Sequence, residues 1–122
     1  MAELDGFERA MPVDEIEEGV IYAVEIDQEE RILVKVDGEI CALNGICTHE
    51  EALLADGDLE GNTIWCPLHS SGFQICTGKV TNPPAVIPLD TYDIRIEDGD
   101  VYVAVEPRPK YKEPPKPTRR RR

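Results

Sequence analysis

The sequence predicts an all-β fold, because short strand-like runs alternate with tight turns and almost no stretch has helical periodicity. The strongest signal comes from two pairs of runs, each flanking an aspartate–glycine dipeptide of the kind that closes a two-residue hairpin. The first of these turns is Asp37-Gly38 and the second is Asp98-Gly99. The chain has 122 residues, a length that suits one domain.

The individual strands are predicted from β-branched and aromatic residues and from alternation of apolar side chains. Residues 20–26 are rich in both residue types, and residues 31–36 alternate so that Ile32, Val34 and Val36 share one face. Only residues 50–55 look helical, for about one and a half turns. The other expected strands are residues 39–43, 62–65, 73–76, 92–96 and 101–105.

Charge is distributed very unevenly along the chain, whose formal net charge is −12. Residues 1–106 hold 24 acidic side chains against five basic ones, and residues 107–122 hold eight basic against one acidic. Such an acidic body repels phosphates, so it disfavours nucleic acid as a partner and favours a basic protein surface. Half of the ten prolines lie in residues 107–117 and four arginines end the chain, so we expect one domain at residues 1–106 and a disordered or extended basic tail at 107–122.

The sequence offers no membrane-spanning or export signal. No run of about 18 or more apolar residues is present, and the acidic N-terminus lacks the basic and then apolar pattern of a signal peptide. We therefore expect a cytoplasmic protein that does not bind membranes. Cytosolic proteins rarely keep disulfides, so metal ligation explains two of the four cysteines better, and Cys41 and Cys76 are interpreted as packing residues.

The most informative motif is Cys47-Thr48-His49 followed by Cys66-Pro67-Leu68-His69. These two clusters contain both histidines of the chain. Two Cys and two His, one of each in either cluster, form the ligand set of a Rieske [2Fe–2S] centre. Two neutral imidazoles in place of two thiolates bring the formal charge of the oxidised centre from −2 to zero, which raises its reduction potential. The motif therefore predicts one-electron transfer.

Two other interpretations of the motif were weighed. The four residues could be buried and bind nothing, but two such clusters that use every histidine are rarely a coincidence. Zinc is the competing metal, since two Cys and two His also form a structural zinc site. Zinc fingers usually open with two cysteines a few residues apart, whereas each cluster here pairs Cys with His.

The chain resembles the small Rieske-type ferredoxins of bacterial aromatic-ring-hydroxylating dioxygenase systems, over roughly residues 10–105. The resemblance rests on the two Cys/His clusters, on Phe73, on Thr77-Gly78-Lys79-Val80 and on Pro83-Pro84-Ala85. It implies a Rieske-type iron–sulfur fold: three antiparallel sheets with a cluster-binding tip formed by two loops, which residues 82–85 would cover. The implied ligands are Cys47 and Cys66 for the inner iron, and His49 and His69 for the outer iron.

Some positions depart from the pattern of respiratory Rieske proteins. Those proteins carry an extra Cys in each ligand loop, joined by a disulfide, and here Ala52 and Leu68 stand in those places. They also place two hydroxyl donors after the second His. Ser71 matches the first donor, but Phe73 cannot donate.

The resemblance implies an electron carrier rather than an enzyme. Such a ferredoxin takes one electron from a flavin-containing, NAD(P)H-dependent reductase and passes it to a terminal oxygenase, as a monomer holding one [2Fe–2S] cluster. Its system serves aromatic hydrocarbon catabolism, and the oxygenase selects the substrate. The alternatives are a small Rieske-like subunit of a nitrite-reductase-type complex and a structural zinc-binding module.

Overall fold

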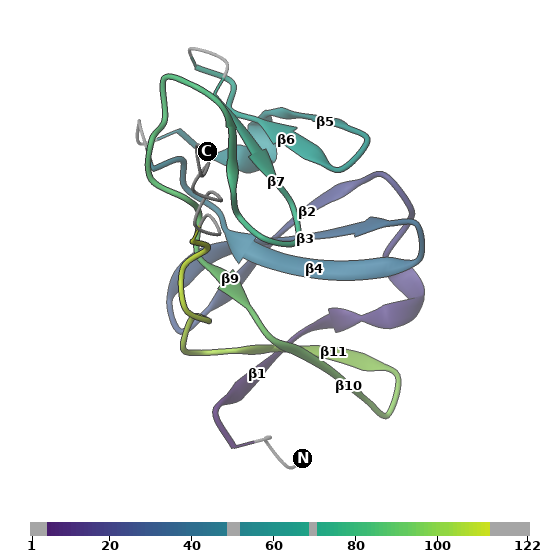
Figure 1. The fold of residues 1–122 in the computed structure, drawn as a ribbon. Coiled ribbons are helices and arrows are strands. Elements are labelled where there is room, and N and C mark those ends of the chain that lie inside the picture. Colours follow the sequence, from purple (N-terminus) through teal and green to yellow (C-terminus); the bar gives the residue numbers. More distant parts are fainter. Residues whose placement is uncertain (1–4, 49–51, 69–70, 113–122) are drawn as a thin grey trace, which may run out of the picture.

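Three antiparallel sheets, stacked one above another, make up the computed structural model, which describes residues 5–48, 52–68 and 71–112 (Figure 1). This confirms the expected fold class. In spatial order the first sheet holds β1 (Phe7–Pro12), β11 (Asp100–Ala104) and β10 (Ile94–Glu97). The middle sheet holds β2 (Ile21–Ile26), β3 (Glu29–Val36), β4 (Glu39–Asn44) and β9 (Thr91–Tyr92). The third holds β5 (Asp58–Glu60), β6 (Thr63–Trp65), β7 (Gly72–Gln74) and β8 (Val80–Asn82), and the described 3₁₀ turns are Val13–Glu15 and Leu54–Asp56.

Both predicted hairpin turns are confirmed, and both have the mirror-image geometry that fits the twist of the flanking strands. Asp37 and Gly38 have φ values of 54° and 80°, and Asp98 and Gly99 have φ values of 51° and 82°. The first turn joins β3 to β4 and the second joins β10 to β11. A third hairpin of the same kind joins β2 to β3 through residues 27–28, which have no glycine to mark them in the sequence.

The middle sheet is buried on both of its faces, which alternation alone did not predict. Ile32 and Val34 share one face, as expected, and belong to the core beneath the third sheet. Leu33 points to the opposite face and belongs to a second core against the first sheet. Strand β3 therefore contributes side chains to both cores, and its consecutive residues Ile32, Leu33 and Val34 are all buried.

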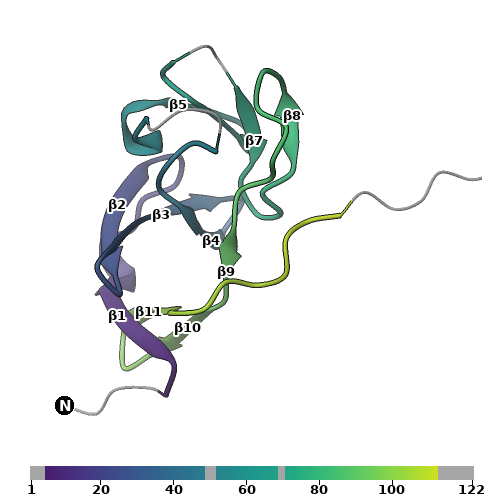
Figure 2. The ribbon, with the colours of Figure 1, turned by 90° about the vertical axis from the view of Figure 1, so that its left-hand side faces the viewer.

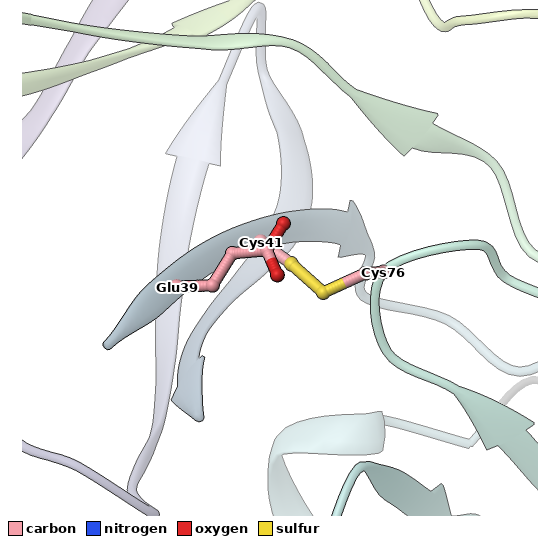
Figure 3. Close-up of side chains that lie close together, drawn as sticks. All are labelled: Glu39, Cys41 and Cys76. Carbon is pink, nitrogen blue, oxygen red and sulfur yellow. A yellow bond between two sulfur atoms is a disulfide. The ribbon is translucent and has the colours of Figure 1, made fainter. Parts of the chain in front are cut away.

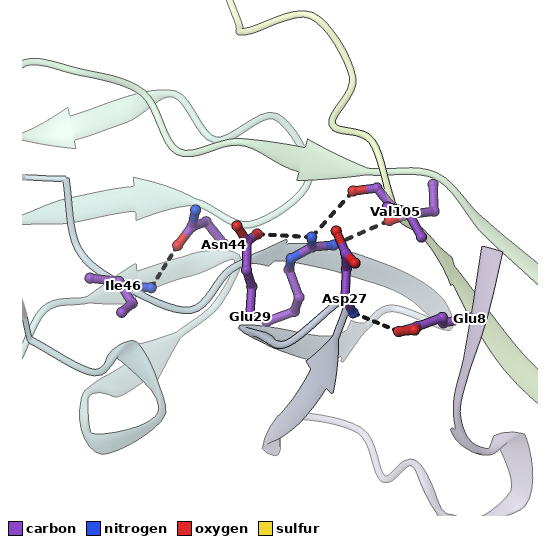
Figure 4. Close-up of polar contacts among 8 residues, drawn as sticks. Glu8, Asp27, Glu29, Asn44, Ile46 and Val105 are labelled. Atoms are coloured by element: carbon purple, nitrogen blue, oxygen red, sulfur yellow. Dashed lines mark hydrogen bonds and ion pairs between the residues drawn. The ribbon is translucent and has the colours of Figure 1, made fainter. Parts of the chain in front are cut away.

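Among the described residues one charged side chain, Arg31, is buried at the junction of the first and middle sheets. Figure 4 shows its partners Glu29 and Val105. Its guanidinium donates hydrogen bonds to the carbonyl oxygens of Ala104 at 3.1 Å and Val105 at 3.2 Å, and it forms an ion pair with Glu29. It also lies 3.8 Å from the centre of the Tyr92 ring. Burial raises the pKa of the Tyr92 phenol, and the positive charge of Arg31 partly offsets that rise.

The predicted element boundaries were wrong in three places. The run 92–96 does not form one strand, because Tyr92 pairs with Ala42 in the middle sheet and Ile94 pairs with Val103 in the first. The expected helix at residues 50–55 is replaced, within the described residues, by the 3₁₀ turn Leu54–Asp56. Strand β7 ends at Gln74, so Cys76 lies in a turn. The strands β1, β5 and β8 were not predicted.

Residues 107–112, which we call the strap, run along the outside of the body past β9 (Figure 2). The Arg108 amide donates to the Thr91 carbonyl at 2.8 Å, and Lys110 forms an ion pair with Asp90 at 2.6 Å. Lys79 lies 5.7 Å from the centre of the Tyr111 ring. Together these contacts hold the strap against the acidic body.

The part of the chain that the structure describes contains no helix long and apolar enough to cross a membrane.

Replacing Arg31 with Met should lower the free energy of unfolding by about 3 kcal/mol, because two carbonyl groups would lose their charged donor inside the protein. Urea denaturation followed by circular dichroism measures the loss. Arg95→Met is the matched control, since Arg95 forms an exposed ion pair with Glu97 and should contribute less than about 1 kcal/mol. Equal losses in the two variants would contradict the central role of Arg31.

Candidate metal centre

The first ligand loop leaves the end of β4 and closes back on itself, which buries Cys47. The Gly45 amide donates to the Glu30 carbonyl at 2.9 Å, and a side chain at position 45 would collide with Glu30. The Cys47 amide then donates to the Ala52 carbonyl at 3.0 Å, and the Leu54 amide donates to the Gly45 carbonyl at 2.9 Å. Glycine at position 45 is thus required by the close approach of Glu30.

The second ligand loop joins β6 to β7 and buries Cys66 in the same way. The Cys66 amide donates to the Ser71 carbonyl at 2.7 Å, so the loop closes within six residues. Cys66 is 3% exposed and Cys47 is 4% exposed, and both belong to the core between the middle and third sheets. His49 and His69, the other two predicted ligands, lie outside the described residues.

Direct backbone contact holds the two ligand loops together. The Gly57 residue that ends the first loop packs against the Trp65 carbonyl, just before Cys66, and any side chain at position 57 would collide with it. The Trp65 ring in turn packs over Gly72, its cross-strand partner on β7. The positions of the two cysteines are therefore determined by one rigid arrangement of backbone.

A third segment, residues 82–88, which we call the covering segment, is hydrogen-bonded to both ligand loops. The Ala85 amide donates to the Ser71 hydroxyl oxygen at 3.0 Å, and the Thr48 hydroxyl donates to the Ile87 carbonyl at 2.7 Å. Ala85 and Ser71 are buried. This segment contains the residues that the resemblance assigned to a covering loop, and it lies where such a loop must lie to shield a group held by Cys47 and Cys66.

The chemistry of the two cysteines fits an iron–sulfur group. Neither takes part in a disulfide, and thiolate sulfur is the donor that iron–sulfur clusters require. A buried thiolate is unstable without a positive partner, and a metal ion supplies that charge. Two buried cysteines from neighbouring loops are therefore suited to bind one cluster.

The interpretation of Cys41 and Cys76 as separate packing residues was wrong. Their sulfur atoms form a disulfide, with the Cα atoms 5.3 Å apart and the two residues 35 positions apart in sequence (Figure 3). The prediction failed because it rested on the expected compartment rather than on the fold. The even number of cysteines left after the two ligand motifs was the available signal.

Comparison with known proteins agrees with this geometry. Residues 7–93 match the model of the Rieske [2Fe–2S] domain. The chain therefore belongs to the Rieske [2Fe–2S] family, whose members hold one such cluster. Within that family it is similar to ferredoxins, which are electron carriers and not catalytic subunits.

Three relatives illustrate the similarity. The ferredoxin component of the naphthalene 1,2-dioxygenase system of Pseudomonas putida is 40% identical over 94 residues, which cover 77% of this chain and 90% of that protein. The ferredoxin of carbazole 1,9a-dioxygenase from Nocardioides aromaticivorans IC177 is 30% identical, with a TM-score of 0.79 over 84% of this chain and 100% of that one. A chain in the complex of reduced oxygenase and oxidised ferredoxin in carbazole 1,9a-dioxygenase is 28% identical, with a TM-score of 0.80 over 86% of this chain and 98% of that one.

These similarities confirm the predicted class of protein. The chain is an electron-transfer ferredoxin with a Rieske-type [2Fe–2S] cluster as its cofactor. The zinc-binding alternative is thereby set aside.

Ser71→Ala should release the covering segment, because the Ala85 amide would lose its acceptor inside the protein. We expect hydrogen exchange at the Ala85 amide to accelerate roughly tenfold or more, which corresponds to about 1.4 kcal/mol. The Leu89 amide, which donates to the Gly78 carbonyl, is the internal control and should keep its protection. Unchanged exchange at Ala85 would contradict this role of Ser71.

Proposed function

We propose that this ferredoxin carries single electrons from a flavin-containing, NAD(P)H-dependent reductase to the terminal oxygenase of an aromatic-ring-hydroxylating dioxygenase system. The observation that carries the proposal is the pair of buried cysteines in two loops clasped by one covering segment. The names of the relatives support it, since they are ferredoxins of dioxygenase systems and one of them is complexed with its oxygenase. We further propose that the protein works in the cytoplasm, as a monomer, without binding membranes or nucleic acid.

We assign Cys47 and Cys66 to the inner iron of the cluster, and His49 and His69 to the outer iron. Burial of the two cysteines supports the first assignment, because an inner ligand must be shielded from water. The sequence motif supports the second. The cluster supplies one-electron redox chemistry, and the protein's part is to hold it, to exclude water from its sulfur side and to leave its histidine side accessible.

Apolar side chains next to the ligand loops support a contact surface for redox partners. Among the described residues, five of the seven exposed large apolar side chains belong to the two ligand loops or to the covering segment. Exposed apolar residues concentrated in this way mark protein contacts. The five exposed apolar side chains at the site are Ile46, Leu53, Leu68, Val86 and Ile87, and Val86 is the most exposed at 82%.

The charge distribution supports electrostatic steering of the same encounters. Electron-transfer complexes bury little surface, so long-range charge contributes much of their association rate. The acidic body favours a basic face on each partner. We propose that residues 1–106 form the Rieske domain and 107–122 a basic tail, whose first part is the strap paired with Asp90 and Asp93.

The ligand assignment predicts unequal effects of cysteine replacement. Cys47→Ser and Cys66→Ser should each lose the visible absorption of the cluster, because a hydroxyl replaces the thiolate that holds the inner iron. The Cys41→Ser/Cys76→Ser double variant is the matched control and should keep its cluster. Iron and acid-labile sulfide measured in each purified protein show whether the cluster is present. A Cys66→Ser protein with the wild-type colour would overturn the assignment.

Steering predicts that reduction by the reductase slows as salt is added. Stopped-flow rates should fall roughly tenfold or more between about 50 mM and about 500 mM salt, as the Debye length becomes shorter than the approach distance. A chain ending at residue 112 keeps the strap but loses the four terminal arginines. Its rate should depend more steeply on salt, because less positive charge then opposes the acidic body.

A second truncation, ending at residue 106, isolates the contribution of the strap. Removing the strap exposes Asp90 and Asp93 and should steepen the salt dependence further. Rates that do not depend on salt in any of the three proteins would exclude electrostatic steering. Weaker salt dependence after truncation would instead mean that the tail itself binds an acidic partner surface.

A further inference from the structure

The Cys41–Cys76 disulfide joins the two sheets that carry the ligand loops. Cys41 lies on β4 of the middle sheet, six residues before Cys47, and Cys76 lies in the turn after β7 of the third sheet, ten residues after Cys66 (Figure 3). Cys41 and Cys76 therefore lie in the elements that flank the two ligand loops and not in the loops themselves. The bond lies at the base of the site.

The middle and third sheets have few other connections at this point. In the part of the chain that the structure describes, no strand of the middle sheet pairs with a strand of the third, and apolar packing beneath the third sheet holds the two sheets together. Cys41 and Cys76 are partly buried at the margin of this core. Within the described residues the disulfide is the one covalent cross-link between the two sheets.

The bond is accessible from the surface. A cavity of about 290 Å³ lies on one side of it, lined by Glu39, Cys41, Cys76 and Arg108 among others. A second cavity, of about 250 Å³, is lined by Asp37, Glu39 and Cys76. The disulfide therefore borders two surface cavities, whereas Cys47 and Cys66 are buried.

We propose that Cys41 and Cys76 are a second redox site of this protein, a dithiol/disulfide couple that tethers the two loop-bearing sheets when it is oxidised. An external dithiol reduces the bond through a mixed disulfide: it gives two electrons and two protons, the S–S bond breaks to two thiols, and the reductant closes to its own disulfide. The couple is chemically separate from the one-electron centre, and the tether does not depend on the proposed redox partners.

The oxidised form should be the more stable one. A cross-link spanning 35 residues restricts the unfolded chain, and the loss of such a bond lowers the melting temperature by roughly 10 °C or more in a domain of this size. The tether also limits separation of the sheets that position Cys47 and Cys66. Reduction should therefore speed loss of the cluster on heating, without changing its ligands.

The experiment compares the full-length holoprotein before and after treatment with dithiothreitol. Mass spectrometry of the denatured protein, alkylated with iodoacetamide, should show Cys41 and Cys76 unmodified before treatment and both modified afterwards. The melting temperature should fall by roughly 10 °C, and bleaching of the visible absorption at a fixed temperature should accelerate severalfold. The visible circular dichroism spectrum at roughly 20 °C should stay the same, because reduction of the disulfide leaves the cluster ligands unchanged.

The Cys41→Ser/Cys76→Ser variant gives an independent measurement. It should resemble the reduced wild type and should no longer respond to dithiothreitol. If it fails to fold, the wild-type comparison still decides. The proposal would be overturned if both cysteines were alkylated in the untreated protein, even after air oxidation. It would also be overturned if reduction of the disulfide left the melting temperature and the bleaching rate unchanged. A protein without any cluster would contradict the proposed function, while the thiol count and melting temperature would still test the tether.

Discussion

The proposed cluster site depends on one constraint: Cys47 and Cys66, which are carried by separate loops, have to be buried together in one core. Hydrogen bonds from their own amides close each loop around its cysteine. Contact between Gly57 and the Trp65 carbonyl brings the loops together, and the covering segment is hydrogen-bonded to both of them. Under the proposed assignment, a cluster held there would need little rearrangement of the protein when it gains or loses an electron, because the surrounding backbone is packed.

The stacked sheets supply the rigidity that this arrangement requires. Strand β3 contributes apolar side chains to two cores, so the middle sheet connects the third sheet, which carries one ligand loop, to the first. Arg31 joins the first and middle sheets by donating to the backbone carbonyl groups of Ala104 and Val105. Displacement of the middle or the third sheet would disturb the contact between the loops, since the first loop begins in the middle sheet and the second lies in the third.

The surface has a different organisation from the site. The acidic side chains are spread over the body, while the exposed apolar residues gather in the ligand loops and the covering segment. Charge acts over about 10 Å and orients an approaching partner, whereas apolar contact acts only after the surfaces meet. The strap neutralises part of the acidic surface beside β9. It also brings Tyr111 close to Lys79, which precedes β8 and the covering segment.

The sequence alone determined the ligand motifs, the all-β class and the two hairpins closed by Asp-Gly, because these depend on local chemistry and on residues close together in the chain. Tertiary structure decided the rest. Residue 31 begins a predicted strand, and only the tertiary structure shows that a second sheet buries the Arg31 side chain. Residues 92–96 looked like one strand until the sheets divided them. Cys41 and Cys76 could be paired only after β4 and the turn beyond β7 had been placed side by side. No local pattern encodes such contacts, because each depends on which distant segment covers a given face.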